Sequence, residues 1–169
     1  GWYTTDGYRV ADIGSLRWST DYVFFVFGVN ADGSLATDVV VKEFTTITPQ
    51  QSSNEFKITI NSMTRSSVNF TVTPTTNDQY YVTVEKVGTL AGYGPGEQKS
   101  YDDLIDYLLP DYENQLTPRL FTGENTITNS QLSKTVNGFS EYKIVVWGFD
   151  NGPTTTVFMS EAFRPADPE

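Results

Sequence analysis

Two residue types that carry much of protein chemistry are missing from this sequence. It contains no cysteine, which excludes disulfides, thiol nucleophiles and thiolate metal sites. It contains no histidine either, so the commonest general base and the commonest ligand for transition metals are absent. Enzymes that depend on either side chain are therefore excluded, and we expect no cofactor.

Long apolar runs and positive charge are also scarce. No stretch approaches the roughly 20 apolar residues of a membrane-spanning helix, so no transmembrane segment is expected. The formal net charge of −10 disfavours nucleic acid as a partner, because phosphate binding needs clustered lysine and arginine. A protein or a glycan is left as the kind of partner to consider.

Residues that favour β-strands are abundant. Aromatic residues make up 14% of the 169 residues, among many threonines and valines. Short stretches in which polar and apolar residues alternate indicate half-buried strands separated by polar turns. The strands predicted in this way are 56–60, 68–72, 80–84, 125–128, 142–147 and 156–163.

A short helix interrupts this series of strands. Ser100 and Asp103 form a Ser-x-x-Asp start, and Pro110 ends the helical pattern. We therefore expect one inserted helix, from about Tyr101 to Leu109, over an open edge or end of the sheets. The glycine-rich loop 88–99 is either a flexible lead-in to this helix or a loop that varies for binding. The apolar face of the helix consists of residues at helical spacing, Tyr101, Leu104, Ile105 and Leu108.

One phrase occurs twice in the chain. The residues from Tyr22 to Asn30 reappear, with the same pattern, from Tyr142 to Asp150. Each copy continues through a glycine- or threonine-rich turn into a strand-like stretch that ends in phenylalanine. A repeat in so short a chain indicates modules of one kind laid end to end.

Alignment outward from the two copies predicts the domain boundaries. Residues 2–7 match residues 120–125, and nothing in the first copy matches 56–84. The first module is therefore expected to be the remnant of a longer chain, with any signal or anchor upstream. The predicted units are the last three strands of one module, a linker, a complete module and a tail, at 1–47, 48–54, 55–165 and 166–169.

A further motif precedes each copy: an aliphatic residue, three others, Ser or Thr, one other and Tyr, at 16–22 and 136–142. It resembles the tyrosine corner of β-sandwiches, in which a tyrosine hydroxyl bonds back to the chain near the start of a central strand. Together with Phe27-Gly28 and the Glu-Phe-Thr-Thr sequence at 43–46, it resembles fibronectin type III-like tandem repeats of Bacteroidetes surface and periplasmic lipoproteins. The second copy departs from that pattern with Trp147 in place of Phe and with Arg164-Pro165 in place of Thr-Thr.

This resemblance implies a mainly β protein. The implied fold is an immunoglobulin-like, fibronectin type III-like antiparallel β-sandwich with one inserted helix, preceded by a partial second sandwich. The implied function is non-catalytic: a spacer, adhesion or protein-interaction module of a cell-envelope lipoprotein. The implied location is the cell surface or periplasm, with a lipid anchor on a segment outside this sequence. The shared motifs are structural, so they specify fold better than function.

Aromatic residues are the main candidates for contacts with a ligand or partner. Trp147, Tyr81 and Tyr93 could stack on sugar rings if they were exposed, which makes a carbohydrate-binding accessory domain the alternative function. On strands of a small sandwich such rings more often belong to the core. Phe25 and Phe27 make the strand of the first copy apolar on both faces. The half-module is therefore expected to pack on the second module or on a neighbouring chain.

Acidic residues are the only basis for a third function, a hydrolase with paired carboxylates. Asp102, Asp103 and Asp106 cluster on the predicted helix, where capping of its N-terminus explains Asp103. The turns at 30–33 and 150–152 contain aspartates, but they lack the further carboxylates of a calcium loop. No catalytic or metal-binding residue is therefore predicted.

Overall fold

The computed structural model describes residues 16–110 and 113–166. It divides the chain into two compact units, Gly1–Thr46 and Ile47–Glu169. The match of residues 2–7, with the third strand expected there, lies outside the described residues, as does most of the predicted tail. Those predictions stay predictions.

The first unit contains a hairpin. β1 (Asp21–Val26) pairs antiparallel with β2 (Val40–Thr45). The connection between them passes through Gly33, whose φ of 85° lies in the left-handed region that favours glycine. The two strands correspond to the repeated phrase and to the strand-like stretch that follows it.

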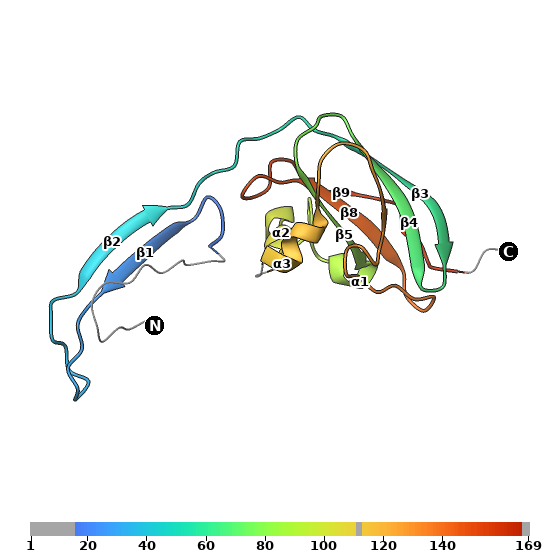
Figure 1. Ribbon diagram of the computed structural model, residues 1–169. Helices are drawn as coiled ribbons and strands as arrows, with labels where there is room; N and C mark the ends of the chain where they lie inside the picture. The colour runs from blue at the N-terminus through green and yellow to red at the C-terminus, as the bar shows by residue number, and fades with distance from the viewer. Residues whose placement is uncertain (1–15, 111–112, 167–169) are drawn as a thin grey trace. The chain divides into compact units, whose positions relative to one another are not determined.

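The second unit holds two antiparallel sheets (Figure 1). The first sheet has the order β3-β4-β7, formed by Phe56–Thr64, Ser67–Pro74 and Asn125–Thr128. The second has the order β6-β5-β8-β9, formed by Leu120–Phe121, Tyr80–Lys86, Tyr142–Gly148 and Phe158–Met159. Every strand predicted in this unit has a counterpart, although the last is much shorter than predicted.

The two sheets pack face to face around one hydrophobic core. Alternate residues of each strand enter it, which is the period that the sequence shows. Burial of a large apolar side chain stabilises a fold by about 1.5–3 kcal/mol, so this cluster is the main source of stability. The mainly β, antiparallel fold predicted from the alternation is thus confirmed. Core residues from the two sheets include Phe70, Val72, Ile127, Tyr80, Val82, Ile144 and Val146.

The opposite face of the second sheet is covered by the segment between β5 and β6 (Figure 1). Tyr81, on the central strand β5, donates from its Oη to the carbonyl oxygen of Leu108 at 3.3 Å. The insertion therefore lies on the face of the sheet. The sequence had suggested a position over an open edge or end, and that prediction is wrong. The insertion also contains more than one helix. The helical elements are α1 (Val87–Leu90), α2 (Tyr101–Leu108), α3 (Glu113–Leu116) and the 3-10 helix η1 (Thr117–Arg119).

Helix α2 begins with the capping arrangement that the sequence predicts. Ser100 Oγ accepts from the Asp103 N–H at 3.1 Å, and Asp103 Oδ2 accepts from the Ser100 N–H at 2.9 Å. These two bonds satisfy amides that have no partner within the helix. At the other end Leu109 is the C-cap, directly before Pro110. The predicted span is correct to within one residue.

Both copies of the repeat form the bond of a tyrosine corner. Tyr142 Oη accepts from the Asn137 N–H at 3.2 Å, five residues earlier. Tyr22 Oη accepts from the Arg17 N–H at 2.9 Å, also five residues earlier. The hydroxyl contact predicted from the motif is therefore present twice, once in each unit.

The turns that follow the two repeated strands, at Gly28 and Gly148, also share their hydrogen bonds. Gly28 N–H donates to Thr37 Oγ1 at 2.7 Å, and Gly148 N–H donates to Thr155 Oγ1 at 2.8 Å. In both hairpins the glycine carbonyl accepts from the N–H of the residue before that threonine. One more antiparallel bridge forms beyond each glycine. The repeat in sequence is thus a repeat of one hairpin structure.

Candidate functional site

One end of the second unit carries a polar pocket of about 570 Å³. Its wall combines three segments: residues 50–53 ahead of β3, Asp78 and Gln79 between β4 and β5, and the turn after β8. Connecting loops of a sandwich cluster at its two ends, so residues far apart in sequence meet there. The turn after β8 contributes Phe149, Asp150 and Thr154.

Two backbone hydrogen bonds hold these segments together. Phe149 N–H donates to the Gln79 carbonyl at 2.9 Å, and Ser52 N–H donates to the Thr154 carbonyl at 2.7 Å. The second bond ties part of the predicted linker to the second unit, and Pro49 is buried as well. The whole stretch 48–54 therefore belongs to the second unit, and it contains no helix or strand.

Asp78 places a negative charge at the pocket. Its Oδ2 accepts from Ser52 Oγ at 2.6 Å and from Thr76 Oγ1 at 2.7 Å. These bonds, with that from Ser52 first, hold the pKa of Asp78 below its ordinary value. The carboxyl group is ionised at neutral pH, so it can accept hydrogen bonds from a ligand but cannot donate a proton.

The rest of the wall mixes an aromatic ring with polar groups. Phe149 is half-buried among the amide, hydroxyl and carboxylate side chains of the lining. Thr154 is buried, and its Oγ1 has no hydrogen-bond partner among the described residues. The atom itself is inaccessible and lies against Gly148, where an added Cβ would overlap it, so it is not available to a ligand.

Trp147 and Tyr81, considered from the sequence as sugar-stacking rings, are both 0% exposed. They stand opposite each other on β8 and β5, and their ring centroids lie 4.3 Å apart. The expectation that they contact a ligand is wrong. The strand is apolar on both faces and the helical segment covers the second face, so the rings pack inside the protein.

Tyr93 lies in a surface group with Tyr107 and Lys99. The rings of Tyr93 and Tyr107 stack at 6.2 Å, and Lys99 Nζ lies 5.0 Å from the centroid of Tyr93. Tyr93 is half-buried, whereas Tyr107 is 64% exposed. Tyr93 therefore already has partners within the protein, and Tyr107, which sequence reasoning did not select, is the more accessible ring.

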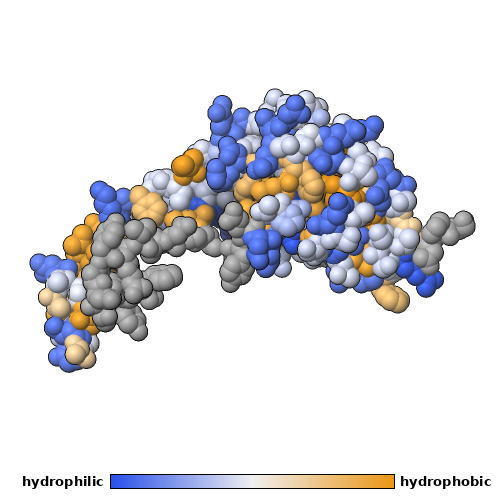
Figure 2. Space-filling view, viewed as in Figure 1, coloured by the Kyte–Doolittle hydropathy of each residue, from blue (hydrophilic) through white to orange (hydrophobic). Residues whose placement is uncertain are grey.

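Phe25 and Phe27 are exposed, with 60% and 41% of their surface accessible. Their rings stack on each other at 6.2 Å. Figure 2 shows apolar surface along the hairpin of β1 and β2. The expectation that the second module or a neighbouring chain covers this strand stays a prediction.

The acidic residues selected from the sequence serve local structure. Asp103 belongs to the capping box of α2. Asp32 Oδ1 accepts from Ser34 N–H and Oγ at 3.0 and 2.6 Å, and these bonds lower the pKa of Asp32. Within residues 16–110 and 113–166, no three acidic side chains are grouped to hold a metal ion.

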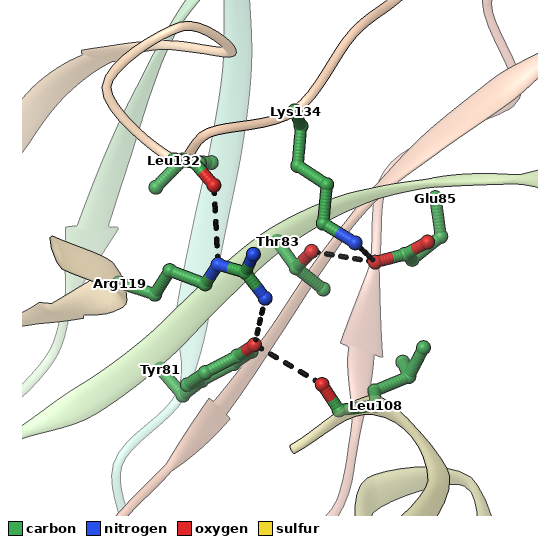
Figure 3. Close-up of polar contacts among 7 residues, drawn as sticks. All are labelled: Tyr81, Thr83, Glu85, Leu108, Arg119, Leu132 and Lys134. Carbon is green, nitrogen blue, oxygen red and sulfur yellow. Dashed lines mark hydrogen bonds and ion pairs between the residues drawn. The ribbon is translucent and has the colours of Figure 1, made fainter. Parts of the chain in front are cut away.

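A buried polar network joins the helical segment to the second sheet (Figure 3). Arg119 Nη1 donates to Tyr81 Oη at 2.9 Å, and Arg119 Nε donates to the Leu132 carbonyl at 3.1 Å. Close by, Glu85 accepts from Thr83 Oγ1 at 2.6 Å and forms an ion pair with Lys134. These groups bind one another, so the network positions the insertion and offers no free reactive group.

Sequence reasoning missed both the network and the pocket. Arg119 carries no local pattern that would predict its burial, and it is paired with residues from distant segments. One feature of the sequence could have pointed to Asp78, Gln79 and Phe149: each lies close to the beginning or end of a predicted strand. Loops at strand ends commonly carry binding residues.

Within the described residues, no helix is long and apolar enough to span a membrane. Comparison of the whole sequence with protein-family models and with curated proteins finds no match.

Proposed function

We propose that this chain is a non-catalytic binding module of the fibronectin type III-like class. Taken in chain order, β3, β4, β5, β7, β8 and β9 correspond to strands A, B, C, E, F and G, in sheets A-B-E and C-F-G. The observation that carries the fold class in this proposal is the tyrosine corner at Tyr142 with its repeat at Tyr22. Two equivalent corners in one chain support a tandem arrangement of such modules.

The pocket is the proposed contact surface of the module. It lies among the loops at one end of the sandwich, and loops positioned by a rigid scaffold commonly carry binding residues. A protein partner would place a polar side chain there, as in an adhesion or protein-interaction domain. A spacer, by contrast, would need no such pocket.

The electrostatics of Asp78 do not suit it to act as a general acid. A hydrolase with two carboxylates needs one of them protonated, which requires a raised pKa. The pKa of Asp78 is lowered by its hydrogen bonds from Ser52 and Thr76. The sequence contains neither histidine nor cysteine, so the commonest general base and the thiol nucleophile are absent.

A carbohydrate-binding accessory domain is the second candidate, and Phe149 favours it. A ring beside carboxylates, amides and hydroxyls can contact the apolar face of a sugar while the polar groups bind its hydroxyls. This version rests on Phe149, since Trp147 and Tyr81 are buried. Tyr93, with Tyr107, is a separate and weaker place for a sugar.

The cell-envelope location belongs to the same proposal. It rests on the resemblance to repeats of surface and periplasmic lipoproteins, and it places the lipid anchor on a segment outside this sequence. Detection of the protein in the membrane-associated fraction after lysis, and its loss when lipid attachment is blocked, would support this location.

Binding of the full chain to immobilised polysaccharides and to candidate protein partners tests the function. If the pocket binds the ligand, Phe149→Ala should weaken binding at least about tenfold, because the ring contact is lost. Phe139→Ala is the matched control, since Phe139 is 94% exposed and precedes the start of β8, while Phe149 follows its end.

Three results would contradict parts of this proposal. An absence of binding to every polysaccharide would remove the carbohydrate candidate. Release of reducing sugars from any of them would overturn the non-catalytic function. Equal losses for Phe149→Ala and Phe139→Ala would show that the pocket is not the contact surface.

A further inference from the structure

β1 and its repeat β8 share a sequence pattern but have different surroundings. In β8, Ile144 and Val146 face the core while Val145 and Trp147 face the helical segment, and all four are fully buried. Their equivalents in the first unit have between 41% and 60% of their surface exposed: Phe24, Phe25 and Val26 in β1, and Phe27 directly after it. The first unit thus contains a strand of the same pattern whose two faces are exposed.

In the second unit, β8 is covered on one edge and on both faces by neighbouring elements. β5 pairs along one edge of β8, with Val84 opposite Ile144 and Thr83 opposite Val145. β3 and β4 supply core residues against one face, and the segment containing α2 covers the other. All of these elements lie within residues 56–119.

No counterpart of β5 is present in the described part of the first unit. There β1 pairs only with β2, which leaves its second edge without a strand. Residues 2–7 match 120–125, but the strands in that part of the second unit, β6 and β7, pair with β5 and β4 and not with β8. Among residues 16–46, β1 therefore has no neighbour that corresponds to β5.

We propose that the β1–β2 hairpin is an acceptor surface for a polypeptide segment built like residues 56–119, whose β5-like strand pairs antiparallel with β1. The register of the second unit places the counterpart of Val84 opposite Phe24 and that of Thr83 opposite Phe25. Backbone hydrogen bonds along the open edge supply affinity, and the two apolar faces select a segment with apolar residues on matching positions.

A second copy of the hairpin fits this surface less well. Two β1 strands paired edge to edge would satisfy their backbone groups but would leave both faces of each hairpin uncovered. A segment like 56–119 covers the edge and both faces together, as it does for β8. The occupant is thus a partner segment with three strands and a helix, not another copy of the hairpin.

The absence of cysteine makes disulfide trapping a direct test. Residues 55–119 are fused ahead of the full chain, with Val84→Cys in the added segment and Phe24→Cys in β1. In β8 the N–H of Tyr142 points to Phe163 and away from β5, so Ile144, two residues on, forms a non-hydrogen-bonded pair with Val84. Such pairs have Cα atoms about 4.5 Å apart, which lies within the range of about 4.4–6.8 Å that a disulfide requires.

The matched control carries Phe25→Cys in place of Phe24→Cys. Successive residues of a strand point to opposite faces, so this pair cannot meet in the proposed register. We expect the Phe24→Cys pair to oxidise at least about tenfold faster, and the amides of residues 23–27 to exchange at least about tenfold more slowly than in the unfused chain. Equal oxidation of the two pairs would overturn the proposal.

A second measurement does not depend on folding of the added segment. A synthetic peptide of residues 79–87 with Val84→Cys is mixed with each full-length variant in a glutathione buffer. Preferential capture by Phe24→Cys over Phe25→Cys, and over Asp32→Cys in the exposed turn, supports strand addition at β1. Failure of both the fusion and the peptide to prefer Phe24→Cys would refute it. A disulfide between two copies of the Phe24→Cys variant, formed in preference to peptide capture, would identify a second copy as the occupant and refute it as well.

Discussion

Gly148 explains why the repeated phrase contains a glycine. A Cβ added there would overlap Thr154 Oγ1 and lie 2.9 Å from Thr155 Cγ2. At the equivalent Gly28 the nearest atom is Thr37 Cγ2, at 3.0 Å. In each hairpin the threonine also binds the glycine N–H, so the close approach belongs to the shared structure.

Gly148→Ala should lower the free energy of unfolding of the second unit by about 1–3 kcal/mol, because the added methyl group overpacks a buried site. Urea unfolding followed by tryptophan fluorescence measures the change. Gly88→Ala is the control: a Cβ there meets nothing within 4 Å, and Gly88 lies in α1. It should be neutral or stabilising by about 0.5–1 kcal/mol. Unchanged stability for Gly148→Ala would contradict the close approach.

Tyr81 is a residue whose burial predicts a pH dependence. Burial raises the pKa of its phenol, and the contact with Arg119 offsets this only in part. The neutral form is thus favoured in the folded state. Its contribution to stability is complete below the unfolded pKa of about 10 and is lost as pH rises through the higher folded pKa.

We therefore expect the free energy of unfolding to fall as pH rises above about 10. Tyr81→Phe, although less stable at neutral pH, should show a shallower fall. Tyr107→Phe serves as the control, since Tyr107 is exposed. Urea unfolding between pH 8 and 11 measures the slopes, and identical slopes for the Tyr81→Phe and unsubstituted chains would count against this account.

At the scale of elements, α2 is the one whose structure follows most directly from local sequence. Its apolar spacing, its Ser-x-x-Asp start and Pro110 all act over a few residues, so they can be recognised without the rest of the fold. The face that it covers could not be predicted in this way. The need for cover was visible in β8, which is apolar on both sides, but the covering segment is set by long-range packing.

Ser100→Ala should destabilise the second unit by about 1 kcal/mol, because the Asp103 amide loses its acceptor. Ser100→Thr keeps the hydroxyl that accepts from the Asp103 N–H and donates to Asp103 Oδ2, so it should retain most of the stability. Thermal unfolding followed by circular dichroism compares the two variants. An equal loss for both would show that the hydroxyl acts through something other than capping.

At the scale of the whole molecule, the hydrophobic core lies within one unit. Every residue of the core cluster belongs to the second unit, whereas many of the exposed large apolar residues lie in the first. Small domains of this size usually unfold as one cooperative transition. The stability of the protein should therefore reside in residues 47–169.

Removal of residues 1–46 should leave the free energy of unfolding of the second unit within about 0.5 kcal/mol of that in the full chain. It should also reduce binding of a hydrophobic dye, because the apolar surface of β1 and β2 is lost. Calorimetry and dye fluorescence measure these two quantities. A loss of stability above about 1 kcal/mol would show that the first unit contributes to folding of the second.

The sequence by itself determined the strands, the helix α2, the repeated hairpin and the two tyrosine corners. Each of these rests on residues close together in the chain, where alternation, capping and turn chemistry act directly. Only the tertiary structure decided that Trp147 and Tyr81 are buried, that Arg119 reaches Tyr81, and that Asp78 and Phe149 share a pocket. These outcomes depend on which distant segments pack together, and no local pattern specifies that.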